Sequence, residues 1–395
     1  MAREIRNIAL LGASGSIGRS TLDIVGRFPD RYRVVALGGG DNLKVLAEQA
    51  ARFRPRLVAV REESGAEKLR ELLWQRGVEI PIQAGREGAV AVAIHPEAEL
   101  LVAAMVGAVG LEPTHAALAA GRDVALANKE SMVMAGRLLN QVAAASGARI
   151  LPLDSEHSAI WQALNGEPRG GVAKLILTAS GGPFREHSRD EMAKVTLEQA
   201  LCHPRWEMGP KITIDSATMM NKALEIIEAR WLFEIPPEKI EVVVHPQSIV
   251  HSLVEYIDGS VLAQLGLPDM RLPIAYALGA PERLELDLPK LSLAEIGRLE
   301  FFAADEERFP ALQLVRRALA LGDTGAIAFN AANEVAVDRF RSGEIGFLEI
   351  AAIVAGVLEQ TEPAEFTTLD EIQNFDRRIR CDLENAPLGQ ANSNP

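Results

Sequence analysis

Asn-Ile-Ala-Leu-Leu-Gly-Ala-Ser-Gly-Ser-Ile-Gly, residues 7–18, is the stretch that decides the fold. Its apolar first half predicts a buried parallel strand, and residues 19–25 then repeat their apolar side chains at helical spacing. Glycines are needed between a strand and a helix where the turn is tight and where the backbone approaches a pyrophosphate. The spacing G-x-x-G-x-x-G is not the commoner G-x-G-x-x-G, so a plain tight turn remains the alternative, but the strand–helix context favours a dinucleotide site.

Strands and helices alternate over the first 150 residues. Such alternation predicts a doubly wound parallel sheet, so we expect an α/β, Rossmann-like domain at 1–150. The second strand, 32–37, ends in the turn Gly38-Gly-Gly-Asp41-Asn42, where domains of this kind contact the adenosine ribose. An acid at this turn favours NAD, because it repels a 2′-phosphate. Further strands are predicted at 57–60, 100–104 and 123–126.

Composition narrows the class of protein. The chain has 395 residues, enough for two or three domains. Its net charge of −13 disfavours nucleic-acid binding, which needs a basic face. Two distant cysteines, Cys202 and Cys381, argue against a disulfide framework. The N-terminus has no apolar signal core, and the longest uncharged apolar run, 100–111, is too short to span a bilayer. We therefore expect a cytoplasmic enzyme of bacterial type with no membrane and no nucleic-acid partner.

Two carboxylates separated by one serine, Asp154-Ser155-Glu156, follow an apolar run at 148–153. If the backbone is extended there, both carboxylates point to the same side and can hold a hard divalent cation. The alternative is a helix N-cap and first turn before the helix predicted at 159–164. This short stretch alone favours the helix start.

Two further segments suggest an anion site. Ser180 and two glycines follow a strand at 174–178, and backbone N–H groups in such a turn can cradle a phosphate. The segment 215–222, Asp-Ser-Ala-Thr-Met-Met-Asn-Lys, brings Ser, Asn and Lys to the start of a helix that begins near 219. Glu225, one turn further on, could supply a third carboxylate to the cation site. A surface helix with a Lys222–Glu225 pair is the alternative.

The remaining segments are a helix start, a long loop and a C-terminal helical region. Residues 128–130, Asn-Lys-Glu, open a helix after the strand at 123–126 and are candidates for ligand contacts, with a capped helix start as the alternative. Residues 185–209 predict a charged loop, and long loops are often lids; a loop whose Trp packs on the core is the alternative. We expect strands between 241 and 265, a helical bundle after 311 and a disordered polar tail at 385–395.

Seven motifs resemble those of the 1-deoxy-D-xylulose 5-phosphate reductoisomerase family. They are Gly12-Ala-Ser-Gly-Ser-Ile-Gly, Ala127-Asn-Lys-Glu-Ser, Asp154-Ser-Glu-His, Ser180-Gly-Gly-Pro-Phe, His203-Pro-x-Trp-x-Met-Gly, Asp215-Ser-Ala-Thr-Met-Met-Asn-Lys and His245-Pro-Gln-Ser-x-x-His. The resemblance implies a homodimer that converts 1-deoxy-D-xylulose 5-phosphate to 2-C-methyl-D-erythritol 4-phosphate, for isoprenoid biosynthesis, with NADPH and Mg²⁺, Mn²⁺ or Co²⁺.

The resemblance also implies a role for each matching residue. The metal ligands are Asp154, Glu156 and Glu225, which form the catalytic set with Lys129 and His203. The substrate is contacted by Ser155, Glu156, Ser180, His203, Trp206, Ser216, Asn221, Lys222 and Glu225. NADPH is contacted by Gly12, Ser14, Gly15, Ser16, Ile17, Gly40, Asn42, Asn128, Glu130 and Gly209. Trp206 and Met208 belong to a closing loop. The expected domains are an NADPH-binding domain (1–150), a catalytic, metal and substrate domain that also forms the dimer interface (151–284), a connecting arm (285–311) and a helical bundle (312–395).

Asp41 departs from the family pattern, in which a basic or neutral residue is common at this position. We still expect a preference for NADPH, through donors such as Asn42, but by a smaller margin. Another NAD(P)-dependent, metal-assisted reductase or oxidative decarboxylase of a hydroxy acid is the competing interpretation, and it does not explain the phosphate-binding residues. A nucleotide-sensing regulator is a second alternative, which the acidic charge disfavours.

Overall fold

The computed structural model describes residues 5–206 and 208–385, which divide into two compact units. The first contains the described parts of Met1–Ser131, Leu139–Ser158 and Asp269–Leu286. The second contains those of Met132–Leu138, Ala159–Pro268 and Asp287–Pro395. The chain passes between the units within the helices α6 (Lys129–Ser146) and α7 (Ser155–Ala163). Residues 269–286 thus belong with the N-terminal sheet, an assignment that the sequence did not predict. The finer division into four domains stays a prediction.

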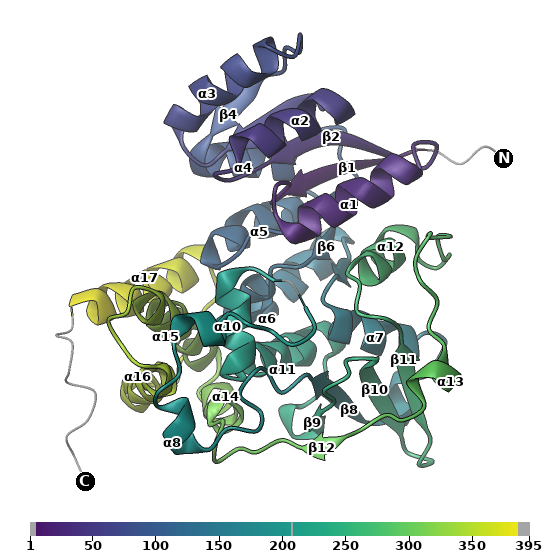
Figure 1. The fold of residues 1–395 in the computed structure, drawn as a ribbon. Coiled ribbons are helices and arrows are strands. Elements are labelled where there is room, and N and C mark those ends of the chain that lie inside the picture. Colours follow the sequence, from purple (N-terminus) through teal and green to yellow (C-terminus); the bar gives the residue numbers. More distant parts are fainter. Residues whose placement is uncertain (1–4, 207, 386–395) are drawn as a thin grey trace. The chain divides into compact units, whose positions relative to one another are not determined.

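A seven-stranded parallel sheet forms the centre of the first unit (Figure 1). Its spatial order is β4 (Ile82–Ala84), β3 (Leu57–Val60), β2 (Tyr32–Gly38), β1 (Arg6–Leu11), β5 (Leu100–Ala103), β6 (Asp123–Leu126) and β7 (Ile150–Pro152). The order reverses between β1 and β5, so the carboxyl ends of these two strands flank the crevice in which such sheets bind ligands. The predicted doubly wound sheet is confirmed.

Helices cover this sheet because its strands are apolar on both faces. Ile8, Leu10 and Leu101 are fully buried. The helices are α1 (Ser16–Arg27), α2 (Leu43–Phe53), α3 (Glu63–Trp74), α4 (Gly85–Ala93), α5 (Leu111–Ala119) and α12 (Arg271–Gly279), with a 3₁₀ turn η1 (Ala108–Gly110). Within this unit α4 lies against β1 to β4, and α12 packs against α1. The short β4 and α4 were not predicted.

A mixed five-stranded sheet forms one part of the second unit. Its order is β11 (Val261–Leu265), β10 (Val250–Tyr256), β8 (Val172–Ala179), β9 (Ile240–Val244) and β12 (Phe302–Ala303). The pair β8 and β9 is parallel, and the other pairs are antiparallel. The His245-Pro-Gln-Ser motif holds the predicted arm, 285–311, against this sheet. The Nδ1 of His245 lies 2.8 Å from the Glu300 carbonyl oxygen. The Gln247 side chain forms hydrogen bonds with the backbone of Arg298 and Glu300.

Helices form the rest of the second unit. They are α8 (Arg189–Met192), α9 (Leu197–Ala200), α10 (Pro210–Ala217), α11 (Met220–Phe233), α13 (Leu293–Ile296), α14 (Ala311–Ala320), α15 (Asp323–Arg341), α16 (Phe347–Gln360) and α17 (Leu369–Asn385), with 3₁₀ turns η2 (Arg169–Gly171) and η3 (Pro237–Lys239). The helix α15 lies at their centre, against α10, α11, α14, α16 and α17. The expected C-terminal helices are therefore confirmed. Of the tail predicted to be disordered, 385–395, Asn385 ends the helix α17, and residues 386–395 lie outside the described residues.

The segment 185–209 is not the irregular loop that the sequence predicted. It contains α8 and α9, each opened by a capping box, in which Ser188 pairs with Glu191 and Thr196 with Gln199. These short helices are held by local hydrogen bonds, so hydrophobic periodicity could not reveal them.

Over the described residues, no helix combines the length and the apolar character that crossing a bilayer requires.

Candidate functional site

The glycine turn after β1 lies at the reversal of strand order. Gly12 has φ +85°, and a Cβ atom there would lie 2.2 Å from the carbonyl oxygen of Ala104, the residue after β5. A Cβ on Gly18 would lie 2.3 Å from the Gly12 carbonyl oxygen. Gly15 is the N-cap of α1, which has no side-chain cap, and both Gly15 and Ser16 are exposed. The first-turn N–H groups can therefore face a pyrophosphate.

Asn128 and Glu130 build the loop that follows β5. The Asn128 amide donates to the carbonyl oxygens of Met105 (2.9 Å) and Gly107 (3.0 Å) and to a Glu130 carboxylate oxygen (2.9 Å). Its oxygen accepts from the Ser131 N–H at 3.2 Å. The structure thus shows these two side chains shaping the loop beside the glycine turn, and their predicted contact with a cofactor stays a prediction.

Asp154 and Glu156 lie at the start of a helix, not on an extended strand. The strand β7 ends at Pro152 and α7 begins at Ser155, so the helix-start alternative describes this backbone. The Glu156 N–H donates to a carboxylate oxygen of Asp154 at 3.4 Å, as it would to an N-cap residue. A carboxylate oxygen of Asp154 still lies within 4.8 Å of one of Glu156, because the first helical turn places both on the same end of α7.

Lys129 neutralises Asp154 inside the first unit. Its Nζ lies 2.6 Å from Oδ2 of Asp154, and the two side chains are only 7% and 13% exposed. Burial by itself would raise the pKa of Asp154, but the nearby Lys129 and His157 outweigh it and hold the pKa below its ordinary value. Asp154 is therefore an ionised carboxylate, which is the form that binds a cation.

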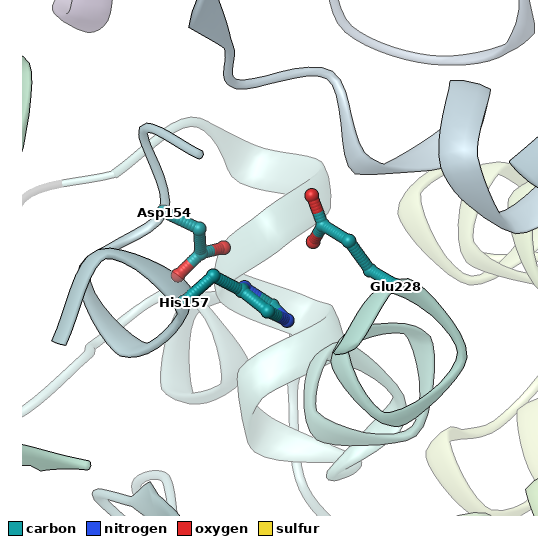
Figure 2. A group of neighbouring side chains, drawn as sticks. All are labelled: Asp154, His157 and Glu228. Carbon is teal, nitrogen blue, oxygen red and sulfur yellow. The ribbon is translucent and has the colours of Figure 1, made fainter. Parts of the chain in front are cut away.

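Sequence reasoning assigned no role to His157 or Glu228, although both are fully buried acid–base groups. Figure 2 shows Asp154, the residue before α7, His157, from the first turn of α7, and Glu228, from α11. A ring nitrogen of His157 lies within 4.8 Å of an Asp154 carboxylate oxygen. The signal was available in the spacing, since each residue follows a predicted metal ligand by three positions and so shares its helix face.

Glu225 is buried in the second unit. The Lys222 ammonium and the Asn221 amide each donate to one of its carboxylate oxygens. Lys222 is 4% exposed and Glu225 is 1% exposed, so a surface helix with a solvated pair is excluded. Breaking such a buried pair by removing one partner is costly, because the other charge is left uncompensated.

The turn after β8 packs against the end of α10. Gly182 has φ +67°, and a Cβ atom there would lie 2.7 Å from the Ser216 carbonyl oxygen. Met219, with φ +63°, then turns the chain so that α11 begins at once and carries Asn221 in its first turn. The second unit thus brings the turn of Ser180 beside Ser216 and the start of α11.

His203 joins the loop that carries Trp206 to the turn of Ser180. Its Nδ1 accepts from the N–H groups of Trp206 (2.9 Å) and Arg205 (3.2 Å), so the ring proton is on Nε2 and is donated to the Ser180 hydroxyl oxygen at 3.0 Å. Burial lowers the pKa of His203 to about 4. The loop ends at Gly209, the exposed N-cap of α10. Trp206 and Met208 are half-buried, and residue 207 lies outside the described residues.

Asp215 ties α10 to the C-terminal helices. It is buried, one oxygen accepts from the Asn333 amide of α15 at 2.8 Å, and the other lies 2.8 Å from the Lys211 ammonium. These contacts give a structural role to Asp215, to which the sequence assigned none. Asp215 fixes α10, the helix whose last turn carries Ser216.

The predicted site residues are divided between the two units. The first unit holds Lys129, Asp154, Ser155 and Glu156, together with the glycine turn, Gly40, Asn42, Asn128 and Glu130. The second unit holds Ser180, His203, Trp206, Gly209, Ser216, Asn221, Lys222 and Glu225. Within its unit each set lies as described above, and the joint action of the two sets is a proposal.

The first unit has a parallel sheet with a glycine turn where the strand order reverses. The second unit has a turn that is predicted to bind a phosphate, and buried carboxylates accompany both features. Together they define a class, the dinucleotide-dependent reductases. Family comparison narrows the class. Residues 8–136 match 1-deoxy-D-xylulose 5-phosphate reductoisomerase, 150–233 match the C-terminal domain of that enzyme, and 265–381 match the DXP reductoisomerase C-terminal domain. The chain belongs to the 1-deoxy-D-xylulose 5-phosphate reductoisomerase family.

Individual relatives agree over nearly the whole chain. The 1-deoxy-D-xylulose 5-phosphate reductoisomerase of Symbiobacterium thermophilum is 51% identical and covers 97% of this chain and 99% of its own. That of Pelotomaculum thermopropionicum is 53% identical, with 95% and 97% covered. A crystal structure of DOX-P reductoisomerase in complex with NADPH, fosmidomycin and magnesium has a TM-score of 0.92 at 42% identity, with 97% and 100% covered. The Zymomonas mobilis enzyme in complex with NADPH has a TM-score of 0.90 at 44% identity, with the same coverage.

We predict that docking of the loop at His203 weakens in acid. When the loop is docked, the His203 ring has a pKa of about 4, below the 6.5 of an ordinary histidine. Between pH 4 and pH 6.5 the ring therefore binds more protons when the loop is released. Docking is therefore complete above about pH 6.5 and is lost as the pH falls toward 4. An NMR titration of the seven histidine rings, with His203→Gln to identify the signal, measures this directly. A His203 signal that titrates near pH 6.5 would contradict the prediction.

Proposed function

We propose that this chain converts 1-deoxy-D-xylulose 5-phosphate to 2-C-methyl-D-erythritol 4-phosphate with NADPH and a divalent metal, in isoprenoid biosynthesis. The observation that carries the proposal is the likeness, over 97% of this chain, to a reductoisomerase solved with NADPH, fosmidomycin and magnesium. The functional groups of both units suit this reaction. A phosphorylated sugar needs an anion site, and a rearrangement at a ketone needs an electrophile at the ketone oxygen.

The first unit fits NADPH. The backbone approach of Gly12 to Ala104 leaves no room for a side chain, and α1 begins without a side-chain cap. Both features favour a pyrophosphate at the start of α1. When bound, NADPH would supply a hydride to the aldehyde carbon that the rearrangement of the ketone produces. Ser14 lies on the turn, Ser16 and Ile17 begin α1, and all three would line the cofactor. Gly40 and Asn42 lie after β2, where the ribose of such cofactors is contacted.

The donor set fits a hard divalent cation such as Mg²⁺, Mn²⁺ or Co²⁺. All three proposed ligands, Asp154, Glu156 and Glu225, are carboxylates, which these metals prefer over thiolates. Asp154 and Glu156 already have oxygens within 4.8 Å of each other, and Asp154 is held ionised by Lys129. When bound, the cation polarises the ketone oxygen of the substrate. Glu225 would join the set when the two units act together.

The remaining residues bind and orient the substrate. The turn of Ser180 with Ser216, Asn221 and Lys222 would hold the phosphate, far from the reacting carbons. Binding far from the reacting carbons fixes the orientation of the substrate, and this fixed orientation contributes to the reaction rate. His203, with its proton on Nε2, can donate to a phosphate oxygen in place of the Ser180 hydroxyl. Lys129 and Ser155 would contact the carbon chain, and closure of the loop with Trp206 and Met208 would exclude water.

A spectrophotometric assay tests the proposal. We expect NADPH oxidation with 1-deoxy-D-xylulose 5-phosphate, abolished by EDTA and restored by added Mg²⁺ or Mn²⁺. A hydroxy acid in place of the sugar phosphate is the control for the competing reductase or decarboxylase. If no NADPH is oxidised, or if EDTA does not change the rate of oxidation, the proposal is wrong.

Glu225→Gln should lower metal affinity and kcat by about tenfold or more while NADPH affinity stays nearly unchanged, because the amide keeps the shape but removes the charge of a ligand. Metal titration of activity and NADPH fluorescence measure the two effects separately. Glu241→Gln, which alters an exposed carboxylate on β9, is the matched control. Equal losses of metal and NADPH binding would mean that Glu225 only supports the fold.

We also propose a homodimer in the cytoplasm. NADPH and a phosphorylated sugar are charged and do not cross a bilayer unaided, which favours that compartment. Dimerisation is supported by β11, an edge strand of the second sheet on which Val261 is 46% and Leu262 is 42% exposed. Exposed apolar residues on an edge strand are typical of an interface.

Sedimentation velocity should therefore give twice the mass of one chain, and Leu262→Glu should shift the protein toward the monomer by burying a charge at the interface. Trp74→Glu, at an exposed position of the first unit, serves as the control. A monomeric unmodified protein would refute the homodimer.

A further inference from the structure

Asp41 poses an electrostatic problem for an NADPH-dependent enzyme. It follows β2 in the turn where dinucleotide-binding domains contact the adenosine ribose, and its side chain is 81% exposed. A 2′-phosphate carries between one and two negative charges at neutral pH, so a carboxylate beside it repels NADPH relative to NADH. Some cation on this surface has to offset the repulsion.

Asn42, the donor suggested by the sequence, is held at the start of α2 and can donate only through the N–H groups of its amide. Its side-chain oxygen caps α2 by accepting from the Val45 N–H at 3.3 Å. An amide also carries no net charge, so Asn42 cannot balance the charges of both Asp41 and a phosphate.

Arg61 supplies the missing cation. It follows β3, the strand beside β2, so both residues lie at the carboxyl ends of neighbouring parallel strands. Its Nη1 lies 3.5 Å from Oδ2 of Asp41. Its Nη2 lies 3.8 Å from the position that a Cβ atom would take on Gly40. The guanidinium is therefore positioned over the turn that the 2′-phosphate must approach.

We propose that Arg61 recognises the 2′-phosphate of NADPH, and that Asp41 competes with this phosphate for Arg61. The pair with Asp41 is long and exposed (66% for Arg61), and exposed pairs of this kind contribute little to stability. A phosphate offers the guanidinium two parallel hydrogen bonds and a larger charge. Exchange of the carboxylate for the phosphate is therefore favourable, and the acid at position 41 becomes compatible with NADPH.

The test measures the dissociation constants of NADPH and NADH by nicotinamide fluorescence, on the full chain without substrate. Arg61→Ala should weaken NADPH by about tenfold or more, as expected for a lost charge-assisted contact, and should change NADH by less than about twofold. Retained NADH binding also shows that the variant is folded. Arg56→Ala is the matched control, because Arg56 forms a similar exposed pair with Glu97 at 3.7 Å in the same unit. It should affect neither cofactor.

Asp41→Asn removes the repulsion and should tighten NADPH by about twofold or more, with NADH unchanged. An unchanged or weaker NADPH affinity in this variant would overturn the part assigned to Asp41. Equal losses of NADPH and NADH in Arg61→Ala, or no loss of either, would overturn the part assigned to Arg61. A selective loss of NADPH in Lys44→Ala, with Arg61→Ala unaffected, would assign recognition to the first turn of α2 instead. Since no substrate is present, these results do not depend on the reaction proposed above.

Discussion

The structure depends on the neutralisation of buried carboxylates. A buried acid is tolerated only when a cation or several donors compensate its charge. Lys129 does this for Asp154 in the first unit, and Lys222 does it for Glu225 in the second. Both lysines lie in the first turn of a helix, where the helix dipole disfavours a cation. The position of the two lysines is therefore explained by the acids that they face, Asp154 and Glu225.

Backbone geometry brings the residues that we propose to bind phosphate together in the second unit. The positive φ of Gly182 lets the turn after β8 touch α10, and that of Met219 lets α11 begin directly after α10. The C-terminal helices take part, because Asn333 of α15 holds Asp215 of α10. The helical bundle thus supports the proposed anion site as well as filling the core.

Sequence periodicity predicted the long elements well because their apolar faces are buried. The strands at 57–60 and 123–126 have the predicted bounds, and helices follow residue 311 as predicted. It missed β4, which has three residues, and α8 and α9, which local capping bonds hold. Short elements bury too little apolar surface to leave a periodic pattern.

By itself, the sequence determined the doubly wound sheet, the glycine turn and the identity of the candidate acids, because these follow from local pattern and residue chemistry. Only the tertiary structure decided that Asp154 precedes a helix, that Lys222 and Glu225 form a buried pair, that the proton of His203 is on Nε2, and that Arg61 stands over Asp41. The physical reason is that charge compensation and hydrogen bonding depend on which residues distant in the chain become neighbours, and a linear pattern does not contain those distances.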